Sequence, residues 1–79
     1  MFVSSPIQKA LHQNFPVQLA ALRQEKNMTS EQLAEKTAID SNKLKRFEAG
    51  DAQPALDDLR KIAAALGVGM DALLAPPQA

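Results

Sequence analysis

The sequence predicts an all-α protein of five helices in a single domain. Two observations lead to this class. Apolar residues recur at steps of three and four, most clearly in residues 56–66, as they do along one face of an α-helix. Between such stretches stand residues that begin or end helices, among them Thr29, Asp40, Gly50 and Gly67. At 79 residues the chain has room for one domain, whose small core requires well-packed helices.

Residues 1–15 form an N-terminal extension, for which two interpretations remain open. Ser5 and Pro6 are a typical helix start, because Ser caps a helix and Pro fits its first position. The extension is therefore either a short additional helix that makes dimer contacts or a tail packed loosely on the domain. Its apolar residues are Phe2, Val3, Ile7, Ala10 and Leu11.

The first helix of the main domain is expected over residues 16–26. Phe15 precedes it and is placed to act as a hydrophobic staple. Asn27 is expected to end it, because asparagine tolerates the left-handed conformation. Its apolar face consists of Val17 or Ala20, together with Leu19 and Leu22.

Residues 29–37 predict a second, shorter helix. Thr29 is a good N-cap, and Gln32 three residues later completes a capping box. Leu33 gives this helix an apolar side, and a tight turn at residues 38–39 follows it.

Residues 41–49 predict a third helix whose outer face is polar and basic. Asp40 is its N-cap, and Gly50 stops it because glycine takes the left-handed conformation at little cost. Two short helices joined by a tight turn form a helix-turn-helix. The inner face carries Leu44, Phe47 and Glu48, and the outer face carries Ser41, Asn42, Lys43, Lys45 and Arg46.

Two more helices complete the domain. Residues 55–66 predict the fourth, which Gly67 ends, and residues 70–74 predict a fifth that closes the core with Leu73 and Leu74. Residues 76–79 form a tail, because Pro76 and Pro77 cannot continue a helix. The apolar face of the fourth helix consists of Leu56, Leu59, Ile62, Ala63 and Leu66.

Composition narrows the classes of function. The chain lacks cysteine, which excludes disulfides and thiolate metal sites. His12, its only histidine, has no acid or nucleophile beside it, and no group of carboxylates has metal-site spacing. We therefore expect no enzyme, no catalytic residue, no cofactor and no metal. Because no apolar stretch approaches the ~20 residues needed to cross a bilayer and no signal peptide is present, we expect a cytoplasmic protein with no membrane partner.

Charge is balanced overall and uneven along the chain. Nine basic and nine acidic residues give a formal net charge of zero, which does not favour nucleic-acid binding. Residues 36–46 nevertheless hold four basic side chains against one acidic side chain. The four are Lys36, Lys43, Lys45 and Arg46.

A series of motif residues runs in order through the main domain. They are Leu22-Arg23, Thr29, Leu33-Ala34, Ile39, Leu44, Glu48, Gly50, Pro54, Leu59, Ile62-Ala63 and Leu66-Gly67. In this combination the segment resembles the lambda-repressor-like, or XRE-type (Cro-like), helix-turn-helix family. The resemblance implies a five-helix lambda-repressor-like DNA-binding domain over residues 16–75. It implies a small transcriptional regulator, a repressor, that binds double-stranded DNA sequence-specifically.

The helix-turn-helix also implies roles for individual residues. The third helix enters the major groove, where Arg46 can contact guanine and Asn42 can contact adenine. Arg23, on the first helix, could contact phosphate, but in the family an arginine here pairs with the glutamate before the glycine turn, which is Glu48. We favour this pair because a buried carboxylate needs a partner. The expected base contacts are Ser41, Asn42, Lys43 and Arg46, and the expected phosphate contacts are Ser30, Gln32, Lys36 and Lys45.

The sequence departs from the family pattern in the turn and after the third helix. Ala38 stands where glycine is common, and Thr37 stands where an aliphatic residue is usual. Asp51 and Ala52 stand where basic residues are frequent, which weakens the expected grip on phosphates.

The partners follow from the small size of a single recognition helix. We expect a homodimer on a palindromic operator, paired through the helix at residues 70–74 with the N-terminal extension as an addition. Two alternatives remain. One is an antitoxin-like module that binds a toxin protein and represses its own promoter. The other is a protein-interaction adaptor without DNA binding.

Overall fold

The computed structural model describes residues 13–76, and these form five helices and no strand. The all-α class is therefore confirmed. The expectations for residues 1–12 and 77–79 lie outside the described residues, including the dimer contacts of Phe2, Val3, Ile7 and Leu11. The helices are α2 (Phe15–Glu25), α3 (Ser30–Thr37), α4 (Ser41–Ala49), α5 (Leu56–Leu66) and α6 (Met70–Leu74).

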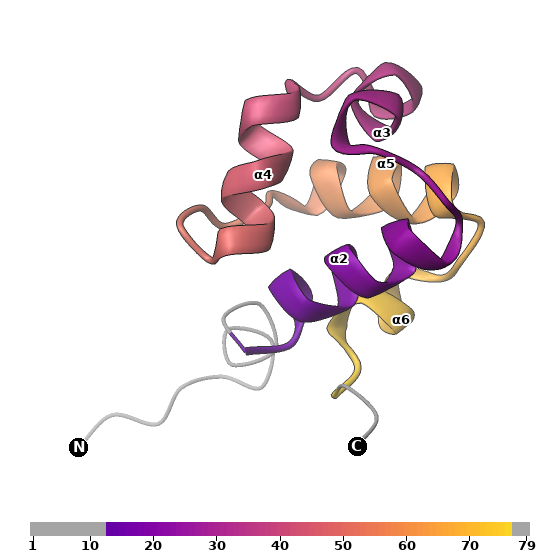
Figure 1. Ribbon diagram of the computed structural model, residues 1–79. Helices are drawn as coiled ribbons and strands as arrows, with labels where there is room; N and C mark the ends of the chain where they lie inside the picture. Colours follow the sequence, from indigo (N-terminus) through magenta and orange to yellow (C-terminus); the bar gives the residue numbers. More distant parts are fainter. Residues whose placement is uncertain (1–12, 77–79) are drawn as a thin grey trace.

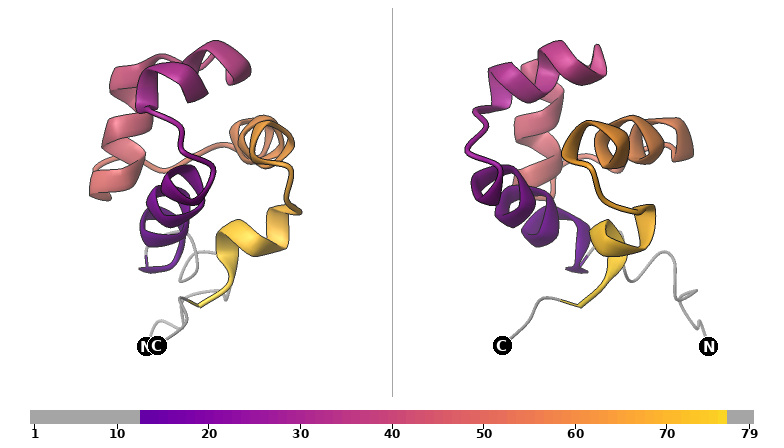
Figure 2. Two further views of the ribbon diagram at one scale, coloured as in Figure 1. Left: turned by 45° about the vertical axis from the view of Figure 1, so that its right-hand side comes forward. Right: turned by 90° about the vertical axis from the view of Figure 1, so that its right-hand side faces the viewer.

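The helices form a closed ring of packed neighbours. Helix α2 packs against α4, α4 against α3, α3 against α5, α5 against α6, and α6 against α2. Figure 1 shows α3 and α4 above α2, with α6 below it, and the left view of Figure 2 shows α4 and α5 on opposite sides of the molecule. The two ends of the domain also meet, since the side chains of Asn14 and Gln18 donate to the carbonyl oxygens of Leu74 and Ala75, each at 2.9 Å.

Two phenylalanines lie at the centre of the core. Phe15 and Phe47 are fully buried and meet edge to face, with ring centroids 5.7 Å apart. Helix α2 begins at Phe15, so this residue is part of the helix and the core, where the sequence had placed it as a staple outside the helix. The other fully buried large side chains are Leu19, Leu33, Leu44, Ile62, Leu66 and Leu73.

Two apolar residues expected in the core lie at the surface. Val17 is 50% exposed, and half-buried Ala20, the alternative at this position, is the less exposed of the two. Leu56 is 67% exposed although it shares a helical face with buried Leu59. It is the first residue of α5, and the covered part of that face begins one turn later, at Leu59. Helical spacing identifies a face, but neighbouring elements decide how far along the helix that face is covered.

The expected caps are present. Thr29 accepts from the backbone N–H of Gln32 at 3.0 Å, and the Gln32 side chain accepts from the N–H of Thr29 at 2.9 Å. Asp40 accepts from the N–H of Asn42 at 2.8 Å. Gly50 ends α4 in the left-handed conformation, with φ at 80°. These caps set where α3 and α4 begin and end, and so the geometry of the turn between them.

The turn accommodates both departures from the family pattern. Ala38 adopts the left-handed conformation with φ at 59°, which carries a steric cost for a residue with a Cβ. Thr37 is buried, and its hydroxyl donates to the carbonyl of Leu33 at 2.8 Å and accepts from the N–H of Ile39 at 3.2 Å. A satisfied hydroxyl costs little in the core, which explains how threonine fits an aliphatic position.

Candidate nucleic-acid interface

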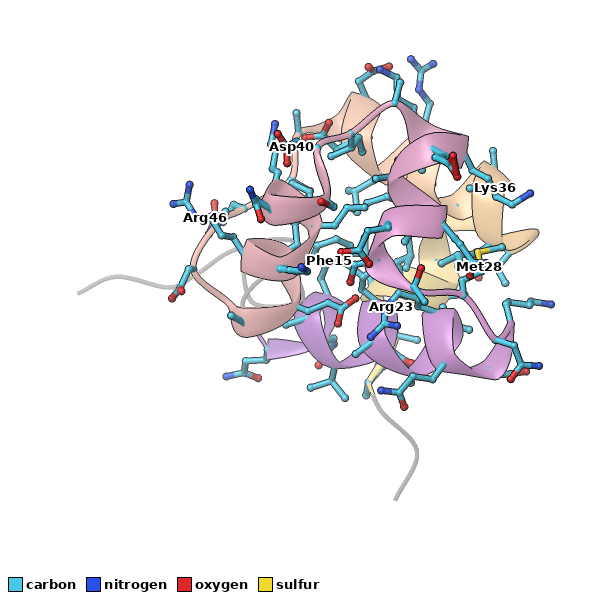
Figure 3. All side chains as sticks on the ribbon, turned by 45° about the horizontal axis from the view of Figure 1, so that its top comes forward. Phe15, Arg23, Met28, Lys36, Asp40 and Arg46 are labelled. Atoms are coloured by element: carbon cyan, nitrogen blue, oxygen red, sulfur yellow. The ribbon has the colours of Figure 1, made fainter. Side chains whose placement is uncertain are left out.

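Helix α4 is anchored on one side and free on the other. Leu44 and Phe47 are fully buried beneath it. Asn42 and Arg46 are exposed, and because they are four residues apart they lie on the same outer face. Figure 3 shows the Arg46 side chain pointing away from the body of the protein. Arg46 forms no ion pair with any residue from 13 to 76. Its guanidinium is therefore available to a partner.

An ion pair fixes how α4 lies against α2. Nε and Nη2 of Arg23 donate to the two carboxylate oxygens of Glu48, at 2.7 and 3.1 Å. Nη1 of Arg23 donates to the carbonyl of Met28 at 2.8 Å, which ties in the loop before α3. The hydrogen bond to Glu48 raises the pKa of Arg23, and burial opposes this to a lesser extent. The pair expected from the sequence is thus present, as a two-pronged link between helices.

Lys43 does not share the outer face with Asn42 and Arg46. Its Nζ lies 3.7 Å from Oδ2 of Asp58 and 5.8 Å from the ring centroid of Phe47. The same Asp58 oxygen accepts from the N–H of Ala55 at 3.0 Å and so caps α5. Lys43 is therefore turned toward α5, and it would have to leave Asp58 before it could contact a base.

Lys45 is paired with an acid that the sequence did not single out. Its Nζ lies 3.2 Å from Oε2 of Glu31, in the first turn of α3. Ser30 and Gln32 are the neighbours of Glu31 in sequence, and Gln32 lines the hollow that also contains Met28 and Lys36. No local pattern marks a pair between residues fourteen positions apart, which is why sequence reasoning missed Glu31.

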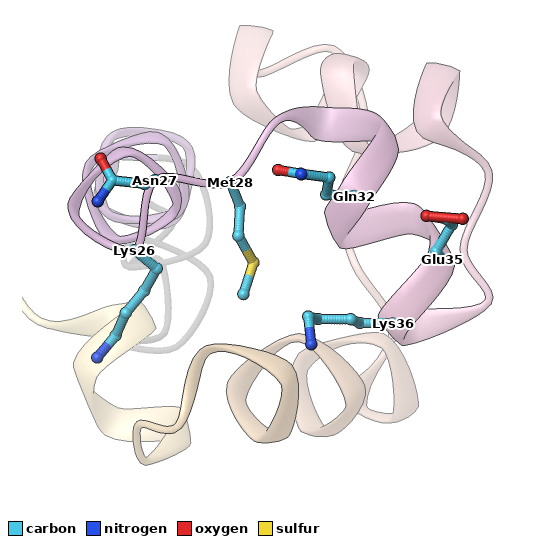
Figure 4. A pocket seen from close by; sticks show the side chains of 6 residues that line it. All are labelled: Lys26, Asn27, Met28, Gln32, Glu35 and Lys36. Atoms are coloured by element: carbon cyan, nitrogen blue, oxygen red, sulfur yellow. The ribbon is translucent and has the colours of Figure 1, made fainter.

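Lys36 lies away from this surface. It lines two open hollows of about 450 and 560 Å³, one with Lys61 of α5 and the other with Met28. Figure 4 shows Met28 in the second hollow with Lys36 beside it, and Figure 3 places Lys36 on the opposite edge from Arg46. The structure thus brings Lys36 together with Gln32, which lines the same hollow, but not with Arg46.

The resulting surface combines α4 with the start of α3. It carries Asn42 and Arg46 on the outer face, half-buried Ser41 at the first position of α4, and Lys45 paired with Glu31 of α3. Within the described part of the chain no group of His, Cys, Asp or Glu side chains could hold a metal ion. None of the helices in residues 13–76 is long and apolar enough to span a membrane. The arrangement offers hydrogen-bond donors and positive charge on one rigid helix.

Comparison with known proteins identifies the family. The HTH_3 helix-turn-helix family matches residues 19–73, and the chain belongs to this family. The resemblance to XRE-type helix-turn-helix proteins is thereby confirmed, and the family supports a non-enzymatic DNA-binding regulator. No curated protein sequence is significantly similar to this chain.

Two solved structures share the fold. One is a hypothetical transcription factor, NHTF, from Neisseria, with a TM-score of 0.82 and 29% identity over 99% of this chain and 88% of that one. The other is an HTH_3 family transcriptional regulator from Vibrio cholerae, with a TM-score of 0.76 and 23% identity over 87% of this chain. The match spans only 38% of the Vibrio cholerae protein.

Proposed function

We propose that this protein is a transcriptional repressor that binds double-stranded DNA sequence-specifically and inserts α4 into the major groove. The observation that carries the proposal is the placement of Asn42 and Arg46. They lie one turn apart on the exposed side of a helix whose other side is locked into the core. Such rigid presentation suits base recognition, since only a fixed side chain can discriminate between base edges.

Each polar residue of α4 then has a role. Arg46 has the donors for a two-pronged contact with O6 and N7 of guanine, and the amide of Asn42 matches N6 and N7 of adenine. Ser41, at the N-terminal end of α4, lies where recognition helices contact bases. Lys43 can join them only by leaving Asp58, so we assign it a secondary role.

Backbone contacts come from the neighbouring elements. Lys45 lies beside the first turn of α3, where Ser30 and the amide end of the helix favour an anion. The carbonyl oxygen of Gln32 is used in the capping box, which leaves its amide nitrogen as the donor for a phosphate. We leave Lys36 out of this set because it lies on the opposite edge of the molecule.

A dimer would compensate for a weak single contact. The chain has a formal net charge of zero, so one copy has little sequence-independent attraction for DNA. Two copies on a palindromic operator would present two α4 helices to successive turns of the groove. Helix α6 is the surface we favour for pairing. Its Leu73 is fully buried in the core, but Met70 and Leu74 remain partly exposed.

Selection of bound sequences from a random DNA pool tests the proposal. We expect a palindromic preferred sequence and an affinity that falls steeply with salt concentration, because phosphate contacts release counterions. Failure to bind DNA at low salt would contradict the proposal and favour a protein-interaction adaptor. Specific binding that tightens when a toxin protein is added would instead favour the antitoxin-like module.

A further inference from the structure

We propose that Glu31 is a built-in competitor of the DNA backbone: its carboxylate holds Lys45 in the free protein, and a DNA phosphate must displace it. This inference rests on the proposed function. Glu31 thereby lowers the affinity of the proposed DNA-binding surface for DNA of every sequence.

The geometry places Glu31 between the two helices of the helix-turn-helix. Its Oε2 lies 3.2 Å from Nζ of Lys45, with both side chains more than half exposed. The carboxylate also accepts a hydrogen bond from its own backbone N–H at the start of α3. This hydrogen bond, followed by the one from Lys45, keeps the pKa of Glu31 below its ordinary value. The side chain is therefore a full anion at neutral pH.

The groups that hold this carboxylate are those that a phosphate would use. Backbone amides at the start of a helix attract anions, and a lysine amino group binds phosphate as a point charge. Carboxylate and phosphate are both anionic acceptors, so they compete for the same donors. In the free protein, the Glu31 carboxylate already binds the Lys45 amino group that we assign to a DNA phosphate.

Exchanging the Glu31 carboxylate for a DNA phosphate costs little free energy because the Glu31–Lys45 ion pair is exposed. Surface ion pairs contribute little free energy, which limits the effect on affinity to about two- to fivefold. The effect is the same for all sequences, because every duplex presents phosphates. Glu31 thus lowers occupancy on arbitrary DNA, so that retention on DNA depends more strongly on the base contacts of Asn42 and Arg46.

The test is Glu31→Gln, which removes the charge and keeps the size of the side chain. Affinity is measured over a range of salt concentrations for a random-sequence duplex and for the preferred duplex. We expect both to bind about two- to fivefold more tightly. We expect the slope of log affinity against log salt to change little, because Lys45 displaces a counterion from a phosphate in both proteins.

Glu35→Gln is the matched control. It removes the same charge from the same helix, but Glu35 forms no ion pair with any described residue. We expect it to increase affinity less than Glu31→Gln does. In a Lys45→Ala background, Glu31→Gln should lose its advantage over Glu35→Gln. The lysine amino group for which the Glu31 carboxylate and the DNA phosphate compete is then absent.

The outcomes separate this inference from the function on which it rests. A wild-type protein without salt-dependent DNA binding contradicts the proposed function itself. If the wild-type protein binds DNA but the Glu31 and Glu35 variants bind equally well, only the competition is overturned. The same holds if the advantage of Glu31→Gln persists without Lys45.

Discussion

Arg23 of α2 and Glu48 of α4 face one another as a planar guanidinium and a carboxylate, with Nε and Oε2 2.7 Å apart. Each side chain is only 16% exposed, so solvent screens the pair weakly. Glu48 directly follows Phe47, a central core residue, on the same helix. The pair and the core therefore set the orientation of α4 together, although Arg23 lies far from the proposed base contacts.

Breaking this pair should destabilise the domain. We expect Glu48→Ala to lower the free energy of unfolding by about 3–5 kcal/mol, because it leaves the Arg23 guanidinium without its partner in a largely buried position. Urea denaturation followed by circular dichroism measures this cost.

A double-mutant cycle with Arg23→Ala isolates the coupling between the two residues. The double variant should be far less destabilised than the sum of the single variants. Asp57→Ala is the control, since the ion pairs of Asp57 within residues 13–76 are with exposed Arg60 and Lys61, and it should cost no more than about 1 kcal/mol. Additive single variants would rule out the link between α2 and α4.

Base recognition should depend on Arg46 and Asn42 separately. We expect Arg46→Ala and Asn42→Ala each to weaken binding to the preferred duplex by about 1–3 kcal/mol. Each variant should also relax the preference at a single base pair, because each side chain is assigned to one base. Affinity for a set of single-substituted duplexes gives both quantities.

Two other variants serve as contrasts. Lys45→Ala should weaken all duplexes about equally and flatten the salt dependence, since its contact is with the backbone. Arg60→Ala, on α5, removes an equal charge away from the interface and should leave sequence preference unchanged. If Arg46, Asn42 and Lys45 variants lose affinity in the same sequence-independent way, the assigned roles are wrong.

The covered part of α5 can be located by comparing two leucines. We expect Leu59→Ala to cost about 2–5 kcal/mol of unfolding free energy, because it leaves a cavity in the core. Leu56→Ala should stay within about 0.5 kcal/mol, because this side chain is 67% exposed. Chemical denaturation of the two variants measures the difference. Equal costs would mean that Leu56 is covered in solution.

The dimer should be visible by its dependence on concentration and on DNA. We expect sedimentation to show a two-subunit complex on a palindromic duplex. In such a complex the two α4 helices would lie about 34–36 Å apart. Met70→Lys should weaken this assembly, and Val17→Lys, on the half-exposed side of α2, should not. A protein that stays monomeric at high concentration and binds a half-site as tightly as a palindrome contradicts the dimer.

Local signals in the sequence located the helices well. Thr29, Asp40 and Gly50 determine where α3 and α4 begin and end through hydrogen bonds and backbone conformations within a few residues. The bounds of α4 match the prediction, and those of α2 differ by one residue. Interactions of this short range are encoded in adjacent residues, which is why they can be predicted without a structure.

Interactions between helices were harder to predict. Arg23 and Glu48 could be paired only through the family resemblance, and the partner of Lys45 had no sequence signal at all. Lys36 lies in the same local excess of positive charge as Lys45, yet Lys36 lines the hollows with Met28 and Lys61, whereas Lys45 pairs with Glu31. Position along the chain does not specify which surface a long side chain joins.

The closed ring of helices bears on how the domain opens. Since α6 packs against α2, the last helix of the described chain is tied to the first, and each helix in between rests on two neighbours. Releasing one helix would expose apolar surface on both sides, so partial opening gains little chain entropy for a large loss of contacts. Amide hydrogen exchange in the buried parts of all five helices should therefore occur through a single cooperative unfolding event.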